Sequence, residues 1–165
     1  MPIVSPGFAG RAGRLRDSVN IPQQRFLQIK KGPQTFFDKA KPLGLYLHFP
    51  FCQSKCAYCD FPSWAGELAL REAYTDALVS EIRARAGETG RLSADTVYLG
   101  GGTPSLMEPA QMARVLAALR ECFDVAPGAE ISCEANPGTL APAFLDALLQ
   151  GGVNRLSLGA QSAHA

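Results

Sequence analysis

Residues 43–61 read LGLYLHFPFCQSKCAYCDF, a short apolar run followed by a loop with three cysteines. The run Leu43–Phe49 predicts a β-strand. Cys52, Cys56 and Cys59 come directly after it in a C-x3-C-x2-C pattern. Parallel α/β folds place their sites at the carboxyl ends of strands. The sequence therefore predicts a functional site in this loop.

Beyond the loop, helical and extended patterns alternate. Helices are predicted at 67–86, from Pro109 onward and at 141–150, and strands at 96–99, 130–135 and 155–158. The helices carry apolar stripes: Leu70, Tyr74, Leu78 and Ile82 in the first, Met112, Val115, Leu116, Leu119 and Phe123 in the second, and Phe144, Leu145, Leu148 and Leu149 in the third. The order β-α-β-α-β-α-β predicts an α/β fold with a parallel sheet and right-handed crossovers.

Charge divides the chain in two. Residues 1–41 hold eight Lys/Arg and two Asp/Glu, a net +6, whereas residues 42–165 hold eight and thirteen, a net −5. Prolines and glycines interrupt residues 1–41, which predicts a basic leader that is mostly disordered or loosely packed. The leader weakly resembles a transit peptide, and an unrelated extension or a misplaced start explains it equally well. The acidic folded part, residues 42–165, argues against nucleic acid as the main partner.

The five cysteines indicate a metal or catalytic site rather than disulfides. No secretory signal opens the chain, and no apolar run is long enough to span a membrane, so a reducing compartment is expected. Three cysteines cluster in the loop, while Cys122 and Cys133 stand apart and are expected to be small buried residues. Phe61 and Trp64 follow the loop and are expected to cover it.

Three thiolates on one tight loop can converge on one metal centre. A 4Fe–4S cluster usually takes four cysteines, so three would leave one iron open. The amino and carboxylate groups of S-adenosylmethionine (SAM) can chelate an open iron, and the reduced cluster can then cleave a C–S bond of SAM. A zinc ion held by the three cysteines and His48 is the alternative that the loop leaves open.

Three further features follow later strands. Gly100-Gly101-Gly102-Thr103-Pro104 comes after the second strand, where glycines let the backbone approach a ligand and leave N–H and C=O groups to hold a carboxylate or an ammonium. Glu134 ends the third strand and needs a partner, such as a ribose hydroxyl or the SAM ammonium. Gln161 follows the fourth strand. Each alone also fits a tight turn or an exposed polar side chain, but their joint placement favours SAM over zinc.

These motifs resemble a known family. YLHFPFCQSKCAYCDF, YLGGGTPSLM, EANPGTL and GVNRLSLGAQS together resemble the radical SAM proteins that are similar to oxygen-independent coproporphyrinogen III oxidase, and within them the HemW-type haem chaperones. The resemblance covers residues 43–162. It implies a partial (β/α)6 barrel followed by a C-terminal domain, of which this chain would hold the first four β/α units.

The resemblance also implies roles for individual residues. The three loop cysteines would bind a 4Fe–4S cluster. The remaining residues would lie at SAM or beside the cluster: Tyr46 and Tyr58 beside SAM, His48 near the cluster, Gly101, Gly102 and Thr103 at the methionyl end of SAM, and Glu134 and Gln161 at its ribose and amino acid portions. Implied partners are haem or a porphyrin, an electron donor such as a flavodoxin or ferredoxin, and a protein that accepts haem.

One position separates two branches of the family. The oxidases carry a further cysteine two residues after the third, where this chain has Phe61. The CDF sequence at 59–61 resembles the chaperone branch, which leaves an anaerobic coproporphyrinogen III dehydrogenase as the second hypothesis.

The chain stops soon after its fourth predicted strand. Ala163-His164-Ala165 does not continue the family pattern, so the sequence predicts a truncated barrel with an exposed edge strand and little activity on its own. An exposed cluster needs reducing conditions, so a cytoplasmic location is expected, with an organelle matrix as the alternative that the basic leader leaves open. An inert fragment is a further alternative.

Overall fold

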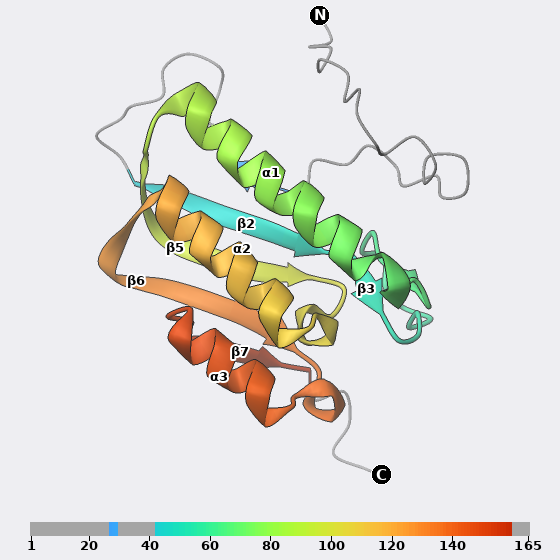
Figure 1. Ribbon diagram of the computed structural model, residues 1–165. Helices are drawn as coiled ribbons and strands as arrows, with labels where there is room; N and C mark the ends of the chain where they lie inside the picture. The colour runs from blue at the N-terminus through green and yellow to red at the C-terminus, as the bar shows by residue number, and fades with distance from the viewer. Residues whose placement is uncertain (1–26, 30–41, 160–165) are drawn as a thin grey trace, which may run out of the picture.

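The computed structural model describes residues 27–29 and 42–159, which build one five-stranded sheet and a two-stranded one. The large sheet has the order β1-β2-β5-β6-β7 (Figure 1). Its strands are β1 (Leu27–Ile29), β2 (Leu43–Phe49), β5 (Ser93–Gly101), β6 (Asp124–Ala135) and β7 (Arg155–Leu158). All neighbours pair in parallel except β1, which runs antiparallel to β2.

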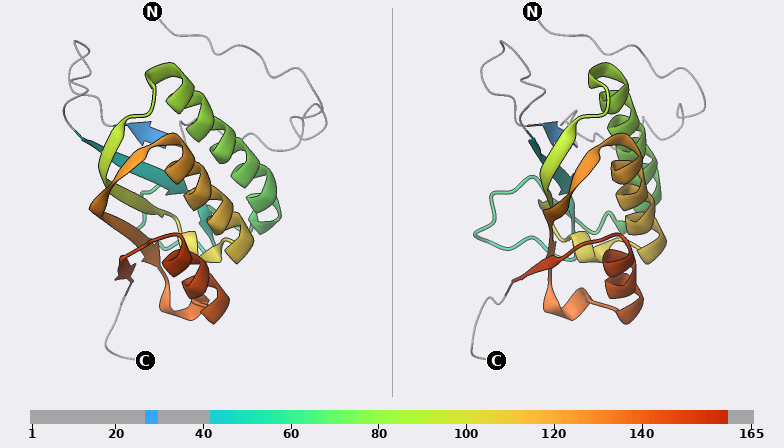
Figure 2. Two further views of the ribbon diagram at one scale, coloured as in Figure 1. Left: turned by 60° about the vertical axis from the view of Figure 1, so that its left-hand side comes forward. Right: turned by 90° about the vertical axis from the view of Figure 1, so that its left-hand side faces the viewer.

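Three helices connect the parallel strands. They are α1 (Arg71–Thr89), α2 (Pro109–Cys122) and α3 (Pro142–Gln150), with the 3₁₀ turns η1 (Leu68–Leu70), η2 (Pro104–Leu106) and η3 (Pro137–Thr139). All three helices cover the same face of the sheet (Figures 1 and 2). The predicted β-α-β-α-β-α-β order is therefore confirmed. The sheet strands β5 and β6 begin earlier than the sequence pattern predicts.

The core lies between this sheet face and the helices. Leu45, Leu47, Val97 and Leu99 alternate along β2 and β5 and are buried against the helices. The predicted stripes of α1 and α2 meet them, because all of their members from Tyr74 onward are buried. The stripe of α3 is only half right: Phe144 and Leu148 are buried, but Leu149 is 70% exposed.

Two elements were absent from the sequence prediction. Within residues 1–41, the three residues of β1 form an edge strand of the main sheet, while the other residues predicted as a leader lie outside the described part. The second is a small parallel sheet of β3 (Phe51–Cys52) and β4 (Trp64–Ala65) on either side of the cysteine loop. Neither contradicts the α/β class.

The face of the sheet away from the helices is polar. Alternate residues of β2, β5 and β6 point to it, including Tyr46, His48, Tyr98 and Glu134. The cysteine loop that follows β2 projects toward this side (Figure 2). Among the described residues, none of the helices is both long and apolar enough to cross a membrane.

Candidate functional site

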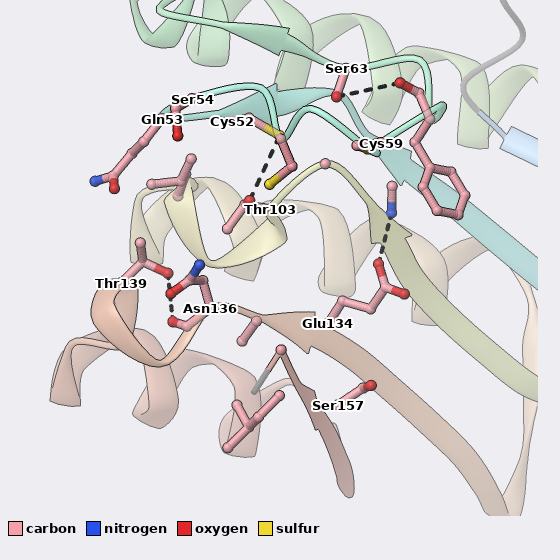
Figure 3. Close-up of a pocket in the computed structure, with 18 of the residues that line it drawn as sticks. Cys52, Gln53, Ser54, Cys59, Ser63, Thr103, Glu134, Asn136, Thr139 and Ser157 are labelled. Carbon is pink, nitrogen blue, oxygen red and sulfur yellow. Dashed lines mark hydrogen bonds between the residues drawn. The ribbon is translucent and has the colours of Figure 1, made fainter. Parts of the chain in front are cut away.

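A cavity of about 330 Å³ lies at the carboxyl ends of the parallel strands. Its size is within the range of small-molecule sites. Its walls come from the cysteine loop, the turn after β5, the end of β6 with η3, and the end of β7 (Figure 3). The residues that line it include Cys52, Cys56, Tyr58, Cys59, Phe61, Ser63, Gly101, Gly102, Thr103, Glu134, Asn136, Thr139 and Ser157.

The cysteine loop is closed at its base by backbone hydrogen bonds. The Trp64 amide donates to the Pro50 carbonyl at 2.7 Å, and the Gly66 amide donates to the Cys52 carbonyl at 3.3 Å. Inside the loop, the Cys59 amide donates to the Cys56 carbonyl at 3.0 Å. These hydrogen bonds fold the loop back on itself, and Cys52, Cys56 and Cys59 all line the same cavity.

The three thiols fit a metal–sulfur centre by their chemistry, and all three line the same cavity. Cys52 and Cys59 are partly exposed and Cys56 is exposed, so all three can be reached by a ligand from the cavity. In the described part of the chain, no three His, Cys, Asp or Glu side chains lie close enough to hold a metal ion as they stand. The loop thus supplies a soft donor set around one cavity, and a cluster bound there would have to draw the sulfurs together.

His48 is a brace for the loop rather than a free ligand. Its Nε2 donates to the Pro62 carbonyl at 2.7 Å, so in the neutral ring Nδ1 is the acceptor. The Tyr46 hydroxyl donates to that Nδ1 at 3.0 Å. With both nitrogens engaged and the side chain buried, His48 as placed has no lone pair left for the zinc site considered from the sequence.

The glycine loop after β5 uses its amides within the protein. The Gly102 amide donates to the Phe49 carbonyl and the Thr103 amide to the Phe51 carbonyl, both at 2.7 Å. The Gly101 amide donates to Glu134 Oε2 at 3.0 Å (Figure 3). The expectation that these N–H groups are free to hold a ligand is therefore wrong. They fasten the glycine turn to the base of the cysteine loop.

Two of these glycines are required by the close packing of that turn. Gly101 has a φ of +118°, and a Cβ there would lie 2.5 Å from the His48 ring. A Cβ on Gly102 would lie 2.6 Å from the Phe51 carbonyl oxygen. The glycines therefore let the β5 turn approach β2 and the cysteine loop, which explains the sequence Gly-Gly-Gly in terms of packing.

Glu134 is held by two donors. The Tyr98 hydroxyl donates to Oε1 at 2.7 Å, and the Gly101 amide occupies Oε2. The carboxylate raises the pKa of Tyr98 to about 12, chiefly through that hydrogen bond and then through burial. Glu134 was expected to need a partner such as a group of SAM, but in the structure its partners are the Tyr98 hydroxyl and the Gly101 amide of the protein. Glu134 also lines the cavity.

Tyr46 and Tyr58 differ in environment. Tyr46 stacks on Tyr98, with ring centroids 6.1 Å apart and an interplanar angle of 21°, and burial together with Glu134 raises its pKa. Tyr58 lies on the loop, exposed, where a hydrogen bond to Cys56 is the main cause of its raised pKa. Phe61 lines the cavity and is itself 59% exposed. Gln161 lies outside the described residues.

The two remaining cysteines are placed largely as expected. Cys133 is buried in β6, and burial with the nearby Glu134 raises its pKa to about 12. Cys122, at the end of α2, is only partly buried. Thr103 contacts the loop, since its hydroxyl lies 3.8 Å from the Cys52 sulfur.

Sequence reasoning missed several polar residues of the site. The side-chain oxygen of Asn136 accepts a hydrogen bond from the Gly138 amide at 3.1 Å. The backbone amide of Asn136 donates to the Ser105 hydroxyl at 3.2 Å. The Ser105 hydroxyl also contacts that of Thr139. Tyr98 and Ser157 were detectable from the period of two along their strands, because they alternate with apolar neighbours. Asn136-Pro137-Gly138 was visible as a turn sequence.

Comparison with known proteins identifies the class. Residues 46–165 match the Radical SAM superfamily. Since the match covers most of the chain, the chain belongs to the radical SAM superfamily.

Its relatives within that superfamily carry two kinds of name. The haem chaperones HemW of Mycobacterium tuberculosis (strain CDC 1551 / Oshkosh) and Escherichia coli (strain K12) are 40% and 41% identical over 74% and 75% of this chain. An oxygen-independent coproporphyrinogen III oxidase of Bradyrhizobium diazoefficiens is 42% identical over 72% of it. These alignments cover 32%, 33% and 27% of the respective relatives. The chain thus spans about a third of their length.

The fold agrees with a solved structure. The coproporphyrinogen III oxidase HemN of Escherichia coli, described as a radical SAM enzyme, superposes with a TM-score of 0.64 at 36% sequence identity. The match covers 68% of this chain and 26% of that one. The α/β class predicted from the sequence is therefore confirmed, as part of that fold.

Proposed function

We propose that this chain forms the cluster-binding and SAM-binding part of a radical SAM 4Fe–4S protein that handles haem, as its HemW relatives are named. The observation that carries the proposal is the convergence of the cysteine loop, the glycine turn and Glu134 on one cavity. Bound there, a cluster with an open iron would supply the electron that cleaves SAM.

One group of residues around the cavity would bind the cluster, and another would bind SAM. Cys52, Cys56 and Cys59 would hold the cluster, with His48 keeping the exit of their loop in place through Pro62. Gly101, Gly102 and Thr103 would present backbone atoms and a hydroxyl to the methionyl end of SAM. The carbonyls of Gly101 and Gly102 are the backbone groups for this role, because all three amides are bonded within the protein and the Thr103 carbonyl accepts from the Leu106 amide.

The opposite wall of the cavity would hold the rest of SAM. Glu134, held by Tyr98 and Gly101, would accept a ribose hydroxyl or the SAM ammonium, and Gln161 would add an amide. Tyr46 and Tyr58 would pack beside it. The complete protein would take haem or a porphyrin, receive electrons from a flavodoxin or ferredoxin, pass haem to an acceptor protein, and work in the cytoplasm.

A second candidate function is anaerobic coproporphyrinogen III dehydrogenase. The observation that favours it is the 42% identity to an oxygen-independent coproporphyrinogen III oxidase. Phe61, where the oxidase pattern has a fourth cysteine, favours the chaperone. Porphyrin product analysis on a full-length homologue distinguishes them: loss of two propionate carboxyl groups supports the dehydrogenase, and haem binding without decarboxylation supports the chaperone.

The first experiment is anaerobic reconstitution of the chain with iron and sulfide. We expect a 4Fe–4S absorption and a reduced EPR signal that changes when SAM is added. Cys56→Ser should lose the cluster, and Cys122→Ser, outside the loop, should keep it. A cluster without a SAM response would contradict the SAM site in this chain. One zinc per chain with neither iron nor sulfide would support the zinc alternative.

A further inference from the structure

Lys55 lies between the first two cysteines and reaches across the loop. Its ammonium donates to the Phe61 carbonyl and to the Ser63 hydroxyl, the latter at 3.2 Å. Phe61 and Ser63 both follow the third cysteine, and both line the cavity with the three thiols. The side chain therefore joins the segment before Cys56 to the segment after Cys59.

This contact fastens a different part of the loop from the other hydrogen bonds. The base is held by Trp64 and Gly66 with Pro50 and Cys52, and the exit by Pro62 with His48. Ser63 also donates to the Phe61 carbonyl at 3.4 Å, so the two acceptors of Lys55 are themselves linked (Figure 3). Lys55 therefore adds hydrogen bonds across the middle of the loop, between its base and its exit.

The charge of Lys55 is also distinctive. It is the only lysine between residues 42 and 165, in a stretch with a net charge of −5. Both acceptors in the structure are uncharged oxygens, a carbonyl and a hydroxyl. Neither acceptor carries a charge that would cancel that of Lys55, and in the sequence Lys55 lies between Cys52 and Cys56.

We propose that Lys55 is a positioning residue of the three-cysteine loop and raises the reduction potential of the cluster held there. The inference rests on the proposed function. In the reduction step, one electron passes from an external reductant to the cluster, and no protein bond forms or breaks. Reduction adds negative charge to a centre that three thiolates already make electron-rich, and a nearby ammonium stabilises the more negative state.

The test is a redox titration of reconstituted Lys55 variants of this chain, with dithionite as reductant and EPR as readout. Lys55→Arg keeps the charge and the donors, Lys55→Gln keeps an amide donor without charge, and Lys55→Met removes both. Arg83→Gln is the control, because it removes an exposed positive charge on α1, where Arg83 pairs with Glu121.

We expect the equilibrium constant for reduction to fall about tenfold in Lys55→Gln and Lys55→Met, a midpoint lower by about 59 mV for one electron. Lys55→Arg and Arg83→Gln should stay at the wild-type value. Unchanged potentials in both uncharged variants would overturn the charge effect. If Lys55→Met alone cannot hold a cluster, the brace is supported and Lys55→Gln decides the charge effect.

A second readout tests the brace without the cluster. In the apo chain, amide hydrogen exchange over residues 53–63 should be faster in Lys55→Met than in wild type and Lys55→Arg, while exchange in α1 stays unchanged. Equal exchange in all variants would overturn the brace. If the wild-type chain forms no cluster, the proposed function fails, and the tuning role of Lys55 with it. If the wild-type chain forms a cluster and the uncharged variants keep both its potential and its exchange rates, only this inference fails.

Discussion

The two faces of one sheet follow different rules in this chain. On the side of the helices, Leu45, Leu47, Val97 and Leu99 are buried by packing alone. On the other side, their immediate neighbours Tyr46, His48, Tyr98 and the β6 residue Glu134 are satisfied by hydrogen bonds to one another and to the backbone.

The helix side of the sheet contributes mainly to stability, and the polar side holds the side chains of the candidate site. Apolar contacts are non-directional, so the helix side requires volume and hydrophobicity. The polar side requires defined partners, since each buried donor or acceptor needs one. All the candidate ligands on the strands come from the polar side, where the cysteine loop also lies (Figure 2). Changes on the two sides should therefore give different kinds of defect.

The largest difference should appear in thiol reactivity. Cys133 faces the helices and its pKa is raised to about 12, so at pH 8 almost none of it is thiolate. We expect the three loop thiols of the apo chain to react with iodoacetamide roughly a thousandfold faster than Cys133. Peptide mass spectrometry measures this, and unfolding in denaturant is the control because it should remove the difference. Comparable rates in the folded chain would contradict the burial of Cys133.

Stability should depend on the helix side. Leu47→Ala removes a fully buried side chain and should cost roughly 2–5 kcal/mol in the free energy of unfolding. Tyr46→Phe, on the next residue but the other face, removes only the hydroxyl that donates to His48 and should cost about 1 kcal/mol. Denaturant unfolding followed by circular dichroism compares the two. Equal losses would mean that the faces do not differ as described.

The glycine turn should be sensitive where it meets the polar face. Gly101→Ala combines a positive φ with a contact to the His48 ring and should cost roughly 1–3 kcal/mol. Gly87→Ala in α1 is the matched control, since a Cβ there meets nothing within 4 Å, and it should be neutral or stabilising. The same unfolding assay applies. A tolerated Gly101→Ala would refute the close approach of the turn to His48.

The smallest expected effect is a change in one tyrosine pKa. Glu134→Gln removes the carboxylate that raises the pKa of Tyr98, so this pKa should fall from about 12 toward the ordinary 10.0. The raised pKa means that the folded state favours the protonated phenol. The corresponding stability is present below pH 10 and is lost as the pH rises toward 12. Ultraviolet titration of phenolate measures it.

A control for that titration is Glu130, which lies on β6 as Glu134 does. Glu130→Gln changes a carboxylate that pairs with Arg155 and accepts from Ser132, and it should leave the Tyr98 pKa in place. If both variants shift the pKa equally, a general charge effect rather than the Tyr98–Glu134 hydrogen bond is responsible.

The parts of the fold that the sequence predicted are those with long periodic patterns. The start of α2 at Pro109 and the bounds of β7 agree with prediction, because apolar period and turn residues mark them. β1 and the β3–β4 pair were missed, since two or three residues show no period and their pairing depends on distant partners. Leu149 is exposed because no described element packs over that side of α3.

The sequence predicted which residues line the candidate site better than it predicted the hydrogen bonds that these residues make. The loop cysteines, the glycines and Glu134 were identified, because parallel topology gathers the residues that follow successive strands. The engagement of the Gly101–Thr103 amides depends on strand register and turn geometry, which residue types alone do not specify. The alternation along β5 marks Tyr98 as a polar-face residue, but its contact with Glu134 follows only from the pairing of β5 with β6.

The local closure of the cysteine loop has a consequence for the order of events during synthesis. His48 and Pro62 are fourteen positions apart in the sequence, and the β3–β4 pair and the Lys55 contacts lie within a similar span. All of these partners leave the ribosome before β5 does, because they precede it in the sequence. Contacts between near neighbours in sequence form fastest, so the nascent chain can shape the thiol-bearing loop while the sheet is still incomplete.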